Sequence, residues 1–294
     1  MKVLVFGGNG FLGNSLNEIL DKKGAEFYSV SRFNHKSNFN LDISDYNQFS
    51  KLPIDFFDAV VNCATILPGG NFLDSEYLEK IYKTNILGSQ NICKWIESQK
   101  SIKKIINCST LVVVDKPWPL NMSENHHTYP TGNHVLYSSS KLVQEVLFQT
   151  FAQSKNISLS QIRFSALYGE KMNWGGVMCN IIDQARSGKS IALRNASKVT
   201  ADFLYVGDAA KIIISALKNN EIGIINGASG IETSILELAK IIVNQIDGEI
   251  KIENVEDSNF EENRSLIDVS KLNKLIDTES FVTLEEGIRK VIKG

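Results

Sequence analysis

The chain has 294 residues, which allows a large hydrophobic core in one or two domains. Its 31 basic and 33 acidic residues give a formal net charge of −2, so neither a nucleic acid nor an anionic membrane surface is an expected partner. No apolar run approaches the ~20 residues of a membrane span, and the N-terminus lacks the hydrophobic region and cleavage site of a signal peptide. We therefore expect a cytoplasmic protein.

Four cysteines are present, and none stands in a CxxC pair. Three of them have apolar neighbours, which favours reduced, packed thiols over a disulfide or a zinc site. The adjacent His126 and His127 would point apart on an extended segment. The sequence therefore predicts no metal site.

The N-terminal segment has the pattern of a phosphate-binding turn. Residues 2–6 form a nearly continuous apolar run, as expected of a parallel strand that is covered on both faces. Gly7, Gly10 and Gly13 follow, and then a helical pattern that Gly24 closes. Glycines at this spacing permit a tight turn whose N–H groups can approach a diphosphate at the helix N-terminus. The alternative is a turn between strand and helix that binds nothing.

If the glycine turn binds a dinucleotide, the residue at the end of the second strand selects between NAD and NADP. This strand covers residues 26–31, and an acidic residue at its end would bond the ribose 2′-OH of NAD. Arg32 follows instead, and its planar cation can take a 2′-phosphate. We therefore expect NADP, with NAD as the alternative. After a third short strand, the segment Leu41-Asp42-Ile43 carries Asp42, which either reaches the adenine edge or caps the following helix.

Two further strands lead to candidate site residues. The strand at residues 58–65 ends in small side chains such as Ala64, which leave room for a cofactor to cross the strand ends. The strand at residues 104–107 delivers Ser109 and Thr110 at its carboxyl end. Ligands of open parallel sheets bind outside these ends, so we expect a binding site there.

Two long helices carry the remaining candidates. Residues 75–98 include Asn85, although an amide in mid-helix is more often solvated or bonded locally. Residues 134–153 contain Tyr137 and Lys141, whose spacing places both side chains on one face of the helix. An ammonium beside a phenol lowers the phenol pKa from its ordinary value of ~10 towards the range of acid–base catalysis. The alternative is that the two residues meet by chance, as on many helices.

Strands and helices alternate through the first 165 residues, which predicts a doubly wound parallel α/β sheet of the Rossmann type. We expect an NAD(P)-binding domain over residues 1–169 plus about 203–228, and a smaller α/β substrate-binding subdomain over residues 170–202 and 229–294. Asp208 follows a strand and is expected to be the N-cap of the helix that runs to Leu217.

The candidate residues fall into motifs with a fixed order. They are GxxGxxG at Gly7, Gly10 and Gly13, the pair Ser109-Thr110, YxxxK at Tyr137 and Lys141, Arg163-Phe164 followed by Tyr168-Gly169, and DFxxVxD at Asp202, Phe203, Val206 and Asp208. In these motifs, and over nearly its full length, the chain resembles the extended short-chain dehydrogenase/reductases. It is most similar to their NAD(P)-dependent epimerase/dehydratase group, which acts on nucleotide sugars.

The resemblance implies a role for each motif. Tyr137 would be the general acid/base, Thr110 would orient the substrate oxygen, and Lys141 would hold the nicotinamide ribose and lower the tyrosine pKa. The reaction implied is hydride transfer between the nicotinamide and a sugar carbinol or ketone, with the phenol moving the proton. The residues expected to contact the cofactor are Gly7, Gly10, Phe11, Leu12, Gly13, Arg32, Asp42, Ile43, Ala64, Asn85, Ser109, Tyr137, Lys141 and Phe164.

The residues beside Thr110 narrow the reaction within the family. Leu111 and Val112 stand where the 4,6-dehydratases carry an Asp-Glu pair. Val112 also stands where the epimerase-reductases that make GDP-fucose carry a cysteine. Aliphatic side chains exchange no proton, so neither dehydration nor ring epimerisation by deprotonation is expected. A 4-ketoreductase or a 4-epimerase remains.

The segment before the DFxxVxD motif departs from the family, which places an arginine there to contact the substrate diphosphate. This chain has Ala201, and a methyl group donates no hydrogen bond. Arg194 and Lys198 lie upstream and are candidates to replace the arginine, while Asn173 matches an asparagine that contacts the substrate. The expected substrate is a nucleotide sugar. The alternatives are a non-nucleotide carbonyl compound as the substrate, or a cofactor-binding regulator without catalysis.

A homodimer is a further expectation, because many family members pair through the two long helices. These helices offer five apolar candidates for the contact, which could equally pack against the sheet: Leu87, Ile92, Ile96, Leu142 and Val146.

Overall fold

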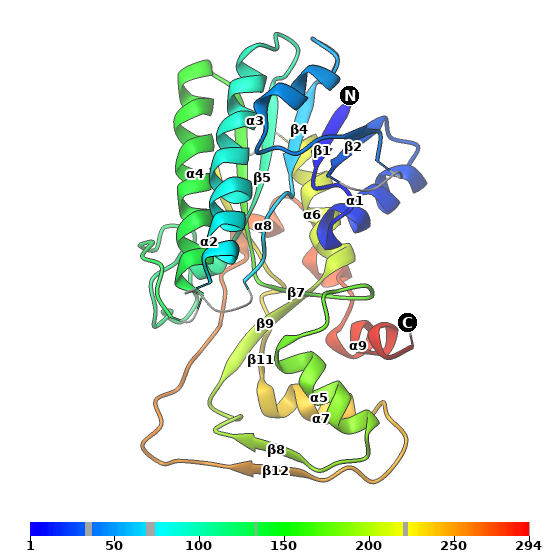
Figure 1. Ribbon diagram of the computed structural model, residues 1–294. Helices are drawn as coiled ribbons and strands as arrows, with labels where there is room; N and C mark the ends of the chain where they lie inside the picture. Colours follow the sequence, from blue (N-terminus) through cyan, green and yellow to red (C-terminus); the bar gives the residue numbers. More distant parts are fainter. Residues whose placement is uncertain (33–36, 69–73, 133, 220–222, 294) are drawn as a thin grey trace.

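The computed structural model describes residues 1–32, 37–68, 74–132, 134–219 and 223–293. Its largest element is a seven-stranded sheet in the order β10-β6-β5-β4-β1-β2-β3, with every neighbouring pair parallel (Figure 1). The strands are β1 Val3–Phe6, β2 Phe27–Ser31, β3 Phe39–Asn40, β4 Ala59–Asn62, β5 Lys104–Thr110, β6 Ser158–Phe164 and β10 Gly223–Gly227. The prediction of a doubly wound Rossmann-type sheet is confirmed.

Helices cover both faces of this sheet. Helices α1 (Phe11–Lys22) and α6 (Val206–Lys218) lie on one face, and α3 (Gly88–Glu97) and α4 (Val135–Lys155) lie on the other (Figure 1). The strand residues alternate between the two cores, because successive side chains of a strand point to opposite faces: Val3 and Val5 pack with α1 and α6, and Leu4 and Phe6 pack with α3 and α4.

The core between the large sheet and helices α3 and α4 contains two of the residues expected at a dimer contact. Ile92 and Ile96 on α3 are buried in it, against the strands, so they are core residues and cannot meet a second chain. Leu87 and Val146 are exposed, and Leu142 is half-buried.

The helix expected at residues 75–98 consists of three successive segments. It begins as α2 (Ser75–Ile81), whose N-cap Asp74 accepts a hydrogen bond from the Glu76 N–H. It continues as the π-helix η2 (Tyr82–Leu87) and ends as α3. A π-helical turn inserts an extra residue into the hydrogen-bond pattern and is frequent at functional sites.

A smaller layered unit lies beyond the carboxyl ends of the large sheet (Figure 1). It contains a three-stranded sheet in the order β11-β9-β7, a two-stranded sheet of β12 and β8, and helices around a separate core. Its elements are β7 Ala166–Tyr168, α5 Gly176–Arg186, β8 Ile191–Arg194, β9 Thr200–Tyr205, β11 Glu232–Ser234, α7 Ile235–Val243, β12 Ile252–Val255 and α9 Leu284–Lys293.

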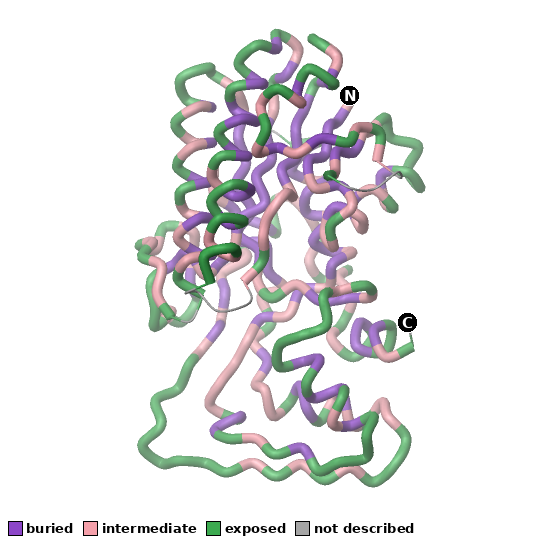
Figure 2. Tube along the Cα trace, in the orientation of Figure 1, coloured by how far each residue is buried: buried purple, intermediate pink, exposed green. Residues whose placement is uncertain are grey.

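The division into two domains stays a prediction. β9 belongs to the three-stranded sheet, although residues from 203 onward were expected with the large domain, whereas α6 and β10 do lie with the large sheet. Residues 255–263 form an exposed segment along the small unit (Figure 2). The remaining short helices are η1 Tyr46–Lys51, η3 Leu111–Val113, α8 Ser270–Asn273 and η4 Thr278–Ser280.

Two expected helix caps differ in the structure. Asp208 is not an N-cap: α6 begins at Val206, and the Asp208 carboxylate, buried in the first turn, accepts hydrogen bonds from the Val282 N–H and from Lys211, each at 2.7 Å. Asp42 accepts from the Ser44 N–H at 2.9 Å, but the cap of η1 is Asp45, because the chain turns once more before the helix starts.

Side chains cover part of the outer edge of the large sheet. The outer strand β10 pairs with β6 on one side. On its other side, Lys271 Nζ donates to the Ile224 carbonyl at 2.7 Å, and the Asn226 N–H donates to Glu124 Oε1 at 2.9 Å.

All four cysteines are free thiols, and three are buried. Over the described part of the chain, no helix combines the length and the apolar character needed to cross a bilayer. The same residues contain no group of three or more His, Cys, Asp or Glu side chains that could hold a metal ion.

Candidate active site

The glycine turn between β1 and α1 is packed so closely that larger residues do not fit. Gly7 has a φ of +75°, and a Cβ on it would lie 2.6 Å from the Ala64 nitrogen at the end of β4. A Cβ on Gly13 would lie 2.8 Å from the Gly8 Cα. No side chain caps α1, and the first N–H groups of a helix have no intrahelical partner. The turn therefore offers backbone donors and a helix N-terminus to an anion.

The end of β2 is rich in hydroxyl and amide groups. Asn9 Nδ2 donates to Ser31 Oγ at 2.9 Å, and Ser31 Oγ donates to Ser37 Oγ at 3.0 Å. Arg32 follows directly and is exposed. One strand further out, the Ile43 carbonyl accepts from Asn91 on α3 at 2.8 Å. The structure thus places Arg32 and the segment from Asp42 to Ile43 after the two outer strands, on the same side of the sheet as the glycine turn.

β5 delivers two hydroxyl groups with different surroundings. Ser109 is 5% exposed, and its Oγ has no hydrogen-bond partner among the described residues. Thr110 is the N-cap of η3, where its Oγ1 accepts from the Val112 N–H at 3.4 Å, and its hydroxyl lies beside the Tyr137 phenol. Phe164 lies opposite Thr110 in the register of β5 and β6.

Tyr137 lies in the first turn of α4 and is 8% exposed. Burial raises the pKa of its phenol above the ordinary value, because the charged phenolate loses its hydration. The hydrogen bond with Thr110 opposes this shift, and the nearby Tyr77 on α2 adds to it. The expectation that Lys141 lowers this pKa is not met, since burial outweighs every favourable neighbour.

Lys141 lies one turn further along α4 and is 2% exposed. Its Nζ donates to the Cys108 carbonyl at 2.6 Å and to Gln144 Oε1. Burial lowers the pKa of Lys141 to about 8, although the Cys108 and Glu145 side chains favour its charged form. The ammonium is thus held between β5 and α4, at the end of the strand that carries Thr110.

Asn85 lies in the π-helix η2 and is fully buried, so the usual solvated role of a mid-helix amide does not apply. Its Oδ1 accepts from the Ile66 N–H at 2.7 Å, and its Nδ2 donates to Ser140 Oγ at 2.9 Å. Asn85 therefore ties the segment after β4 to the helix that carries Tyr137.

These groups fit a dinucleotide. The glycine turn leaves space that a Cβ would fill, a helix N-terminus faces it, and the buried Ser109 hydroxyl has no partner within the part of the chain that the structure describes. Such a cofactor would be held by the glycine turn at its diphosphate and by Lys141 at its ribose, near the Thr110–Tyr137 pair.

The residues expected to bind the substrate are not gathered at this pair. Arg194 is exposed at the end of β8, which lies at the end of the molecule remote from β5 and α4 (Figure 1). Lys198 donates to the Asp257 and Phe260 carbonyls at 2.7 and 3.3 Å, so its ammonium holds the exposed segment of the small unit. Asn173 is exposed before α5.

Arg264, which belongs to none of the motifs, lies beside β9, the strand that contains Ala201. Glu232 is the register partner of Asp202, and Arg264 donates to its two carboxylate oxygens at 2.8 and 2.5 Å. This bidentate pair lowers the Glu232 pKa to about 2. Arg264 lies far from Ala201 in the sequence, so only the fold reveals the proximity.

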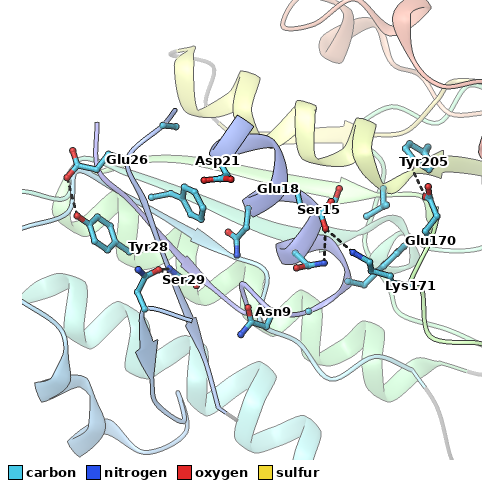
Figure 3. A pocket seen from close by; sticks show the side chains of 18 residues that line it. Asn9, Ser15, Glu18, Asp21, Glu26, Tyr28, Ser29, Glu170, Lys171 and Tyr205 are labelled. Carbon is cyan, nitrogen blue, oxygen red and sulfur yellow. Dashed lines mark hydrogen bonds and ion pairs between the residues drawn. The ribbon is translucent and has the colours of Figure 1, made fainter. Parts of the chain in front are cut away.

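A groove of about 1210 Å³ runs along the outer side of α1 from the glycine turn (Figure 3), and Tyr137 is not among the residues that line it. Glu18 accepts from Lys171 at 3.0 Å, and Tyr205 donates to Glu170 at 2.7 Å. Further carboxylates, Asp21 and Glu26, line the groove, so it disfavours an anionic ligand. We place the site at the strand ends because the acid–base groups and the backbone donors are there.

Comparisons with known proteins agree with this arrangement. The family model described as "NAD dependent epimerase/dehydratase family" matches residues 3–227. The chain belongs to this family, and it is therefore an enzyme of the extended short-chain dehydrogenase/reductase class, as its motifs predicted.

The similarity to individual relatives extends over nearly the whole chain. It is 29% identical to a UDP-N-acetyl-alpha-D-glucosaminuronate decarboxylase of Bacillus cytotoxicus, over 99% of this chain and 97% of the relative. It is 25% identical to UDP-glucuronic acid decarboxylase 1 of Danio rerio, over 99% of this chain and 72% of the relative. The crystal structure of UDP-glucuronic acid 4-epimerase from Bacillus cereus in complex with NAD has the same fold, with a TM-score of 0.83 and 22% identity over 100% of this chain and 96% of the other.

Proposed function

We propose that the protein oxidises or reduces C4 of a nucleotide sugar with a bound nicotinamide cofactor. The observation that carries the proposal is the Thr110 hydroxyl beside the Tyr137 phenol, at the strand ends and beside a turn built for a diphosphate. Relatives named as nucleotide-sugar epimerases and decarboxylases support the substrate class.

The chain's own residues account for the proton and for the exclusion of water. When bound, the cofactor accepts or supplies the hydride. Tyr137 takes or returns the hydroxyl proton at its Oη, and Thr110 Oγ1 holds the substrate oxygen within reach of it. Lys141 binds the ribose, and its positive charge opposes the effect of burial on the phenol pKa without overcoming it. Because Tyr137 is almost completely buried, the transfer proceeds away from bulk water.

The 4-epimerase and 4-ketoreductase reactions are the first candidates, because Leu111 and Val112 beside Thr110 cannot move protons. Decarboxylation is a second candidate, which the names of two relatives favour. Oxidation at C4 of a uronic acid gives a β-keto acid, which loses its carboxylate as CO₂; the enolate that remains takes a proton at C5 before hydride returns to C4. All three reactions therefore use the same groups for hydride and proton transfer at C4.

The finer cofactor proposal is NADP. Its support is Arg32, which follows β2 where an acidic residue would select NAD, together with the neutral hydroxyl and amide groups of Ser31 and Asn9. The ratio of NADPH to NADH affinity, measured by calorimetry, tests it. A preference for NADH would overturn this part alone.

Replacing Tyr137 tests the proton transfer. The substitution Tyr137→Phe is expected to lower kcat on the reactive nucleotide sugar by roughly 10²–10⁴-fold and to leave cofactor affinity nearly unchanged. Tyr129→Phe, at a tyrosine that is 67% exposed, is the matched control and should retain full activity. The assay follows products of UDP-glucose, UDP-glucuronic acid and 4-keto sugar nucleotides by chromatography and released CO₂.

Two results of that assay separate the alternatives. If no nucleotide sugar binds while simple carbonyl compounds are reduced, the substrate class is wrong. If the wild-type protein binds the cofactor and turns over neither class, both proposed substrate classes are wrong.

A homodimer is the proposed assembly. Tyr82 and Leu87 on η2 and Val143 and Val146 on α4 are exposed apolar side chains on the two helical segments expected to pair.

A further inference from the structure

Lys141 is the ammonium on which the proposed function depends, and it is held by a side chain that none of the motifs contains. Its Nζ donates to the Cys108 carbonyl at 2.6 Å and to Gln144 Oε1. An ammonium has three donors, so these two contacts leave one N–H for a ligand hydroxyl. Gln144 therefore fixes the direction of one of the three N–H bonds of the ammonium.

Gln144 is itself fixed from its other end. The side chain is fully buried, and its Nε2 donates to Ser89 Oγ at 2.7 Å and to the Asn85 carbonyl at 3.3 Å. Ser89 gives its own hydroxyl proton to the Asn85 carbonyl at 2.7 Å, so its Oγ can only accept from Gln144. Turning the amide over would place its oxygen against two acceptors, and the Oε1 is therefore kept towards Lys141.

The other charged groups near the ammonium do not take the place of Gln144. Glu145 is the adjacent carboxylate on α4, but Arg163 on β6 binds both of its oxygens, at 3.0 and 2.8 Å. The Cys63 and Cys108 thiols lie 3.5 Å apart, and their mutual hydrogen bond, together with burial, raises the Cys63 pKa. The Tyr137 phenol is also kept neutral by burial.

We propose that Gln144 is a positioning residue for Lys141, which keeps the buried ammonium charged and aimed at the cofactor ribose. The catalytic consequence rests on the proposed function, whereas the effect on Lys141 does not. Burial already lowers the Lys141 pKa to about 8, so the loss of one acceptor lowers it further.

The direct test is the titration of Lys141 in cofactor-free protein, followed by NMR with ¹³C-labelled lysine side chains. The Lys141 signal is assigned by its loss in Lys141→Met. In Gln144→Met, which keeps the side-chain length without the acceptor, the titration midpoint is expected to move to lower pH by roughly one to two units. Ser89→Ala, which frees the Gln144 amide to turn over, should move it in the same direction by a smaller amount.

Gln161→Met is the matched control, because Gln161 is a buried glutamine that accepts from Asn107 at 3.1 Å. Its replacement should leave the Lys141 midpoint unchanged. An unchanged midpoint in Gln144→Met, or an equal shift in the control, overturns the proposal. If Gln144→Met does not fold, the Ser89→Ala titration decides.

A second readout connects the contact to catalysis. In Gln144→Met the alkaline limb of the kcat profile should move to lower pH by the same amount as the Lys141 midpoint, with little change in the KM of the sugar nucleotide. A shifted midpoint with an unshifted profile would overturn the catalytic part of the proposal. If the wild-type protein shows no turnover, the proposed function fails, and the NMR titration still tests Gln144.

Discussion

At the scale of single residues, Lys141 is an ammonium buried between β5 and α4, where a backbone carbonyl and an amide oxygen replace water. The spacing of Tyr137 and Lys141 placed both on one face of a helix, and α4 does contain them. The partners of the ammonium were not predictable, because the Cys108 carbonyl comes from a strand distant in the sequence and Gln144 belongs to no motif. The Tyr137 pKa was misjudged for the same reason, since the degree of burial depends on the tertiary structure.

The glycine turn gives a prediction at this scale. In Gly13→Ala the new Cβ would meet the Gly7 carbonyl and lie 2.8 Å from the Gly8 Cα, so α1 must move away from the turn. We expect the free energy of unfolding to fall by roughly 1–3 kcal/mol, and the cofactor affinity to fall with it. Urea denaturation and calorimetric titration measure the two effects.

Gly175→Ala is the control, because Gly175 has an extended φ and nothing lies within 4 Å of its added Cβ. An unchanged denaturation midpoint together with normal cofactor binding in Gly13→Ala would show that the turn is not as tightly packed as we describe.

At the scale of elements, the periodic pattern of the sequence was sufficient for the sheet but not for the π-helix. Continuous apolar runs such as Val3–Phe6 predict buried parallel strands, and the structure has them. The π-helix η2 has no comparable signal, because one extra residue in a turn hardly changes the hydrophobic pattern. The cap of α6 was misplaced because Asp208 bonds Val282, which is distant in the sequence.

The buried ion pair between α4 and β6 gives a prediction at this scale. Arg163 donates to both carboxylate oxygens of Glu145. Glu145→Gln leaves the guanidinium buried without its counter-charge, so we expect a loss of roughly 3–5 kcal/mol in the free energy of unfolding. The double substitution Glu145→Leu with Arg163→Met should recover much of this loss, because neither charge is then buried.

The exposed ion pair of Glu97 and Lys155, at 2.7 Å, serves as the control. Glu97→Gln should cost less than about 1 kcal/mol, since water screens the pair. Equal losses for Glu97→Gln and Glu145→Gln in urea denaturation would contradict the distinction.

At the scale of the molecule, the sequence predicted two units but not how each segment is assigned. The segment of Asp202 and Phe203 lies in β9 of the three-stranded sheet, while α6, which follows at once, packs on the large sheet. Neighbouring residues with the same apolar character therefore belong to different cores. The sequence does not show where the chain passes from the small unit to the large sheet. The sequence could not show whether Ile92 and Ile96 face the sheet or a second chain. A helix that packs on a sheet and also forms a dimer contact has an apolar side for each.

The homodimer gives the prediction at this scale. Val146 on α4 is 57% exposed, and a charge there should prevent a second chain from packing on the helix. We expect the wild-type protein to be a dimer by light scattering and Val146→Glu to be a monomer with an unchanged denaturation midpoint. Lys155→Glu, at the far end of α4, is the control and should remain dimeric. A monomeric wild type would exclude this assembly.

The outer strand β10 has a consequence for the behaviour of the folded protein in concentrated solution. An open parallel sheet ends in a strand that can recruit another extended segment through its unpaired backbone groups. Here the ammonium of Lys271 binds the Ile224 carbonyl and the carboxylate of Glu124 binds the Asn226 N–H. A foreign strand would have to displace both ionic partners before it could add to the sheet, so self-association into fibrous aggregates is disfavoured along this margin.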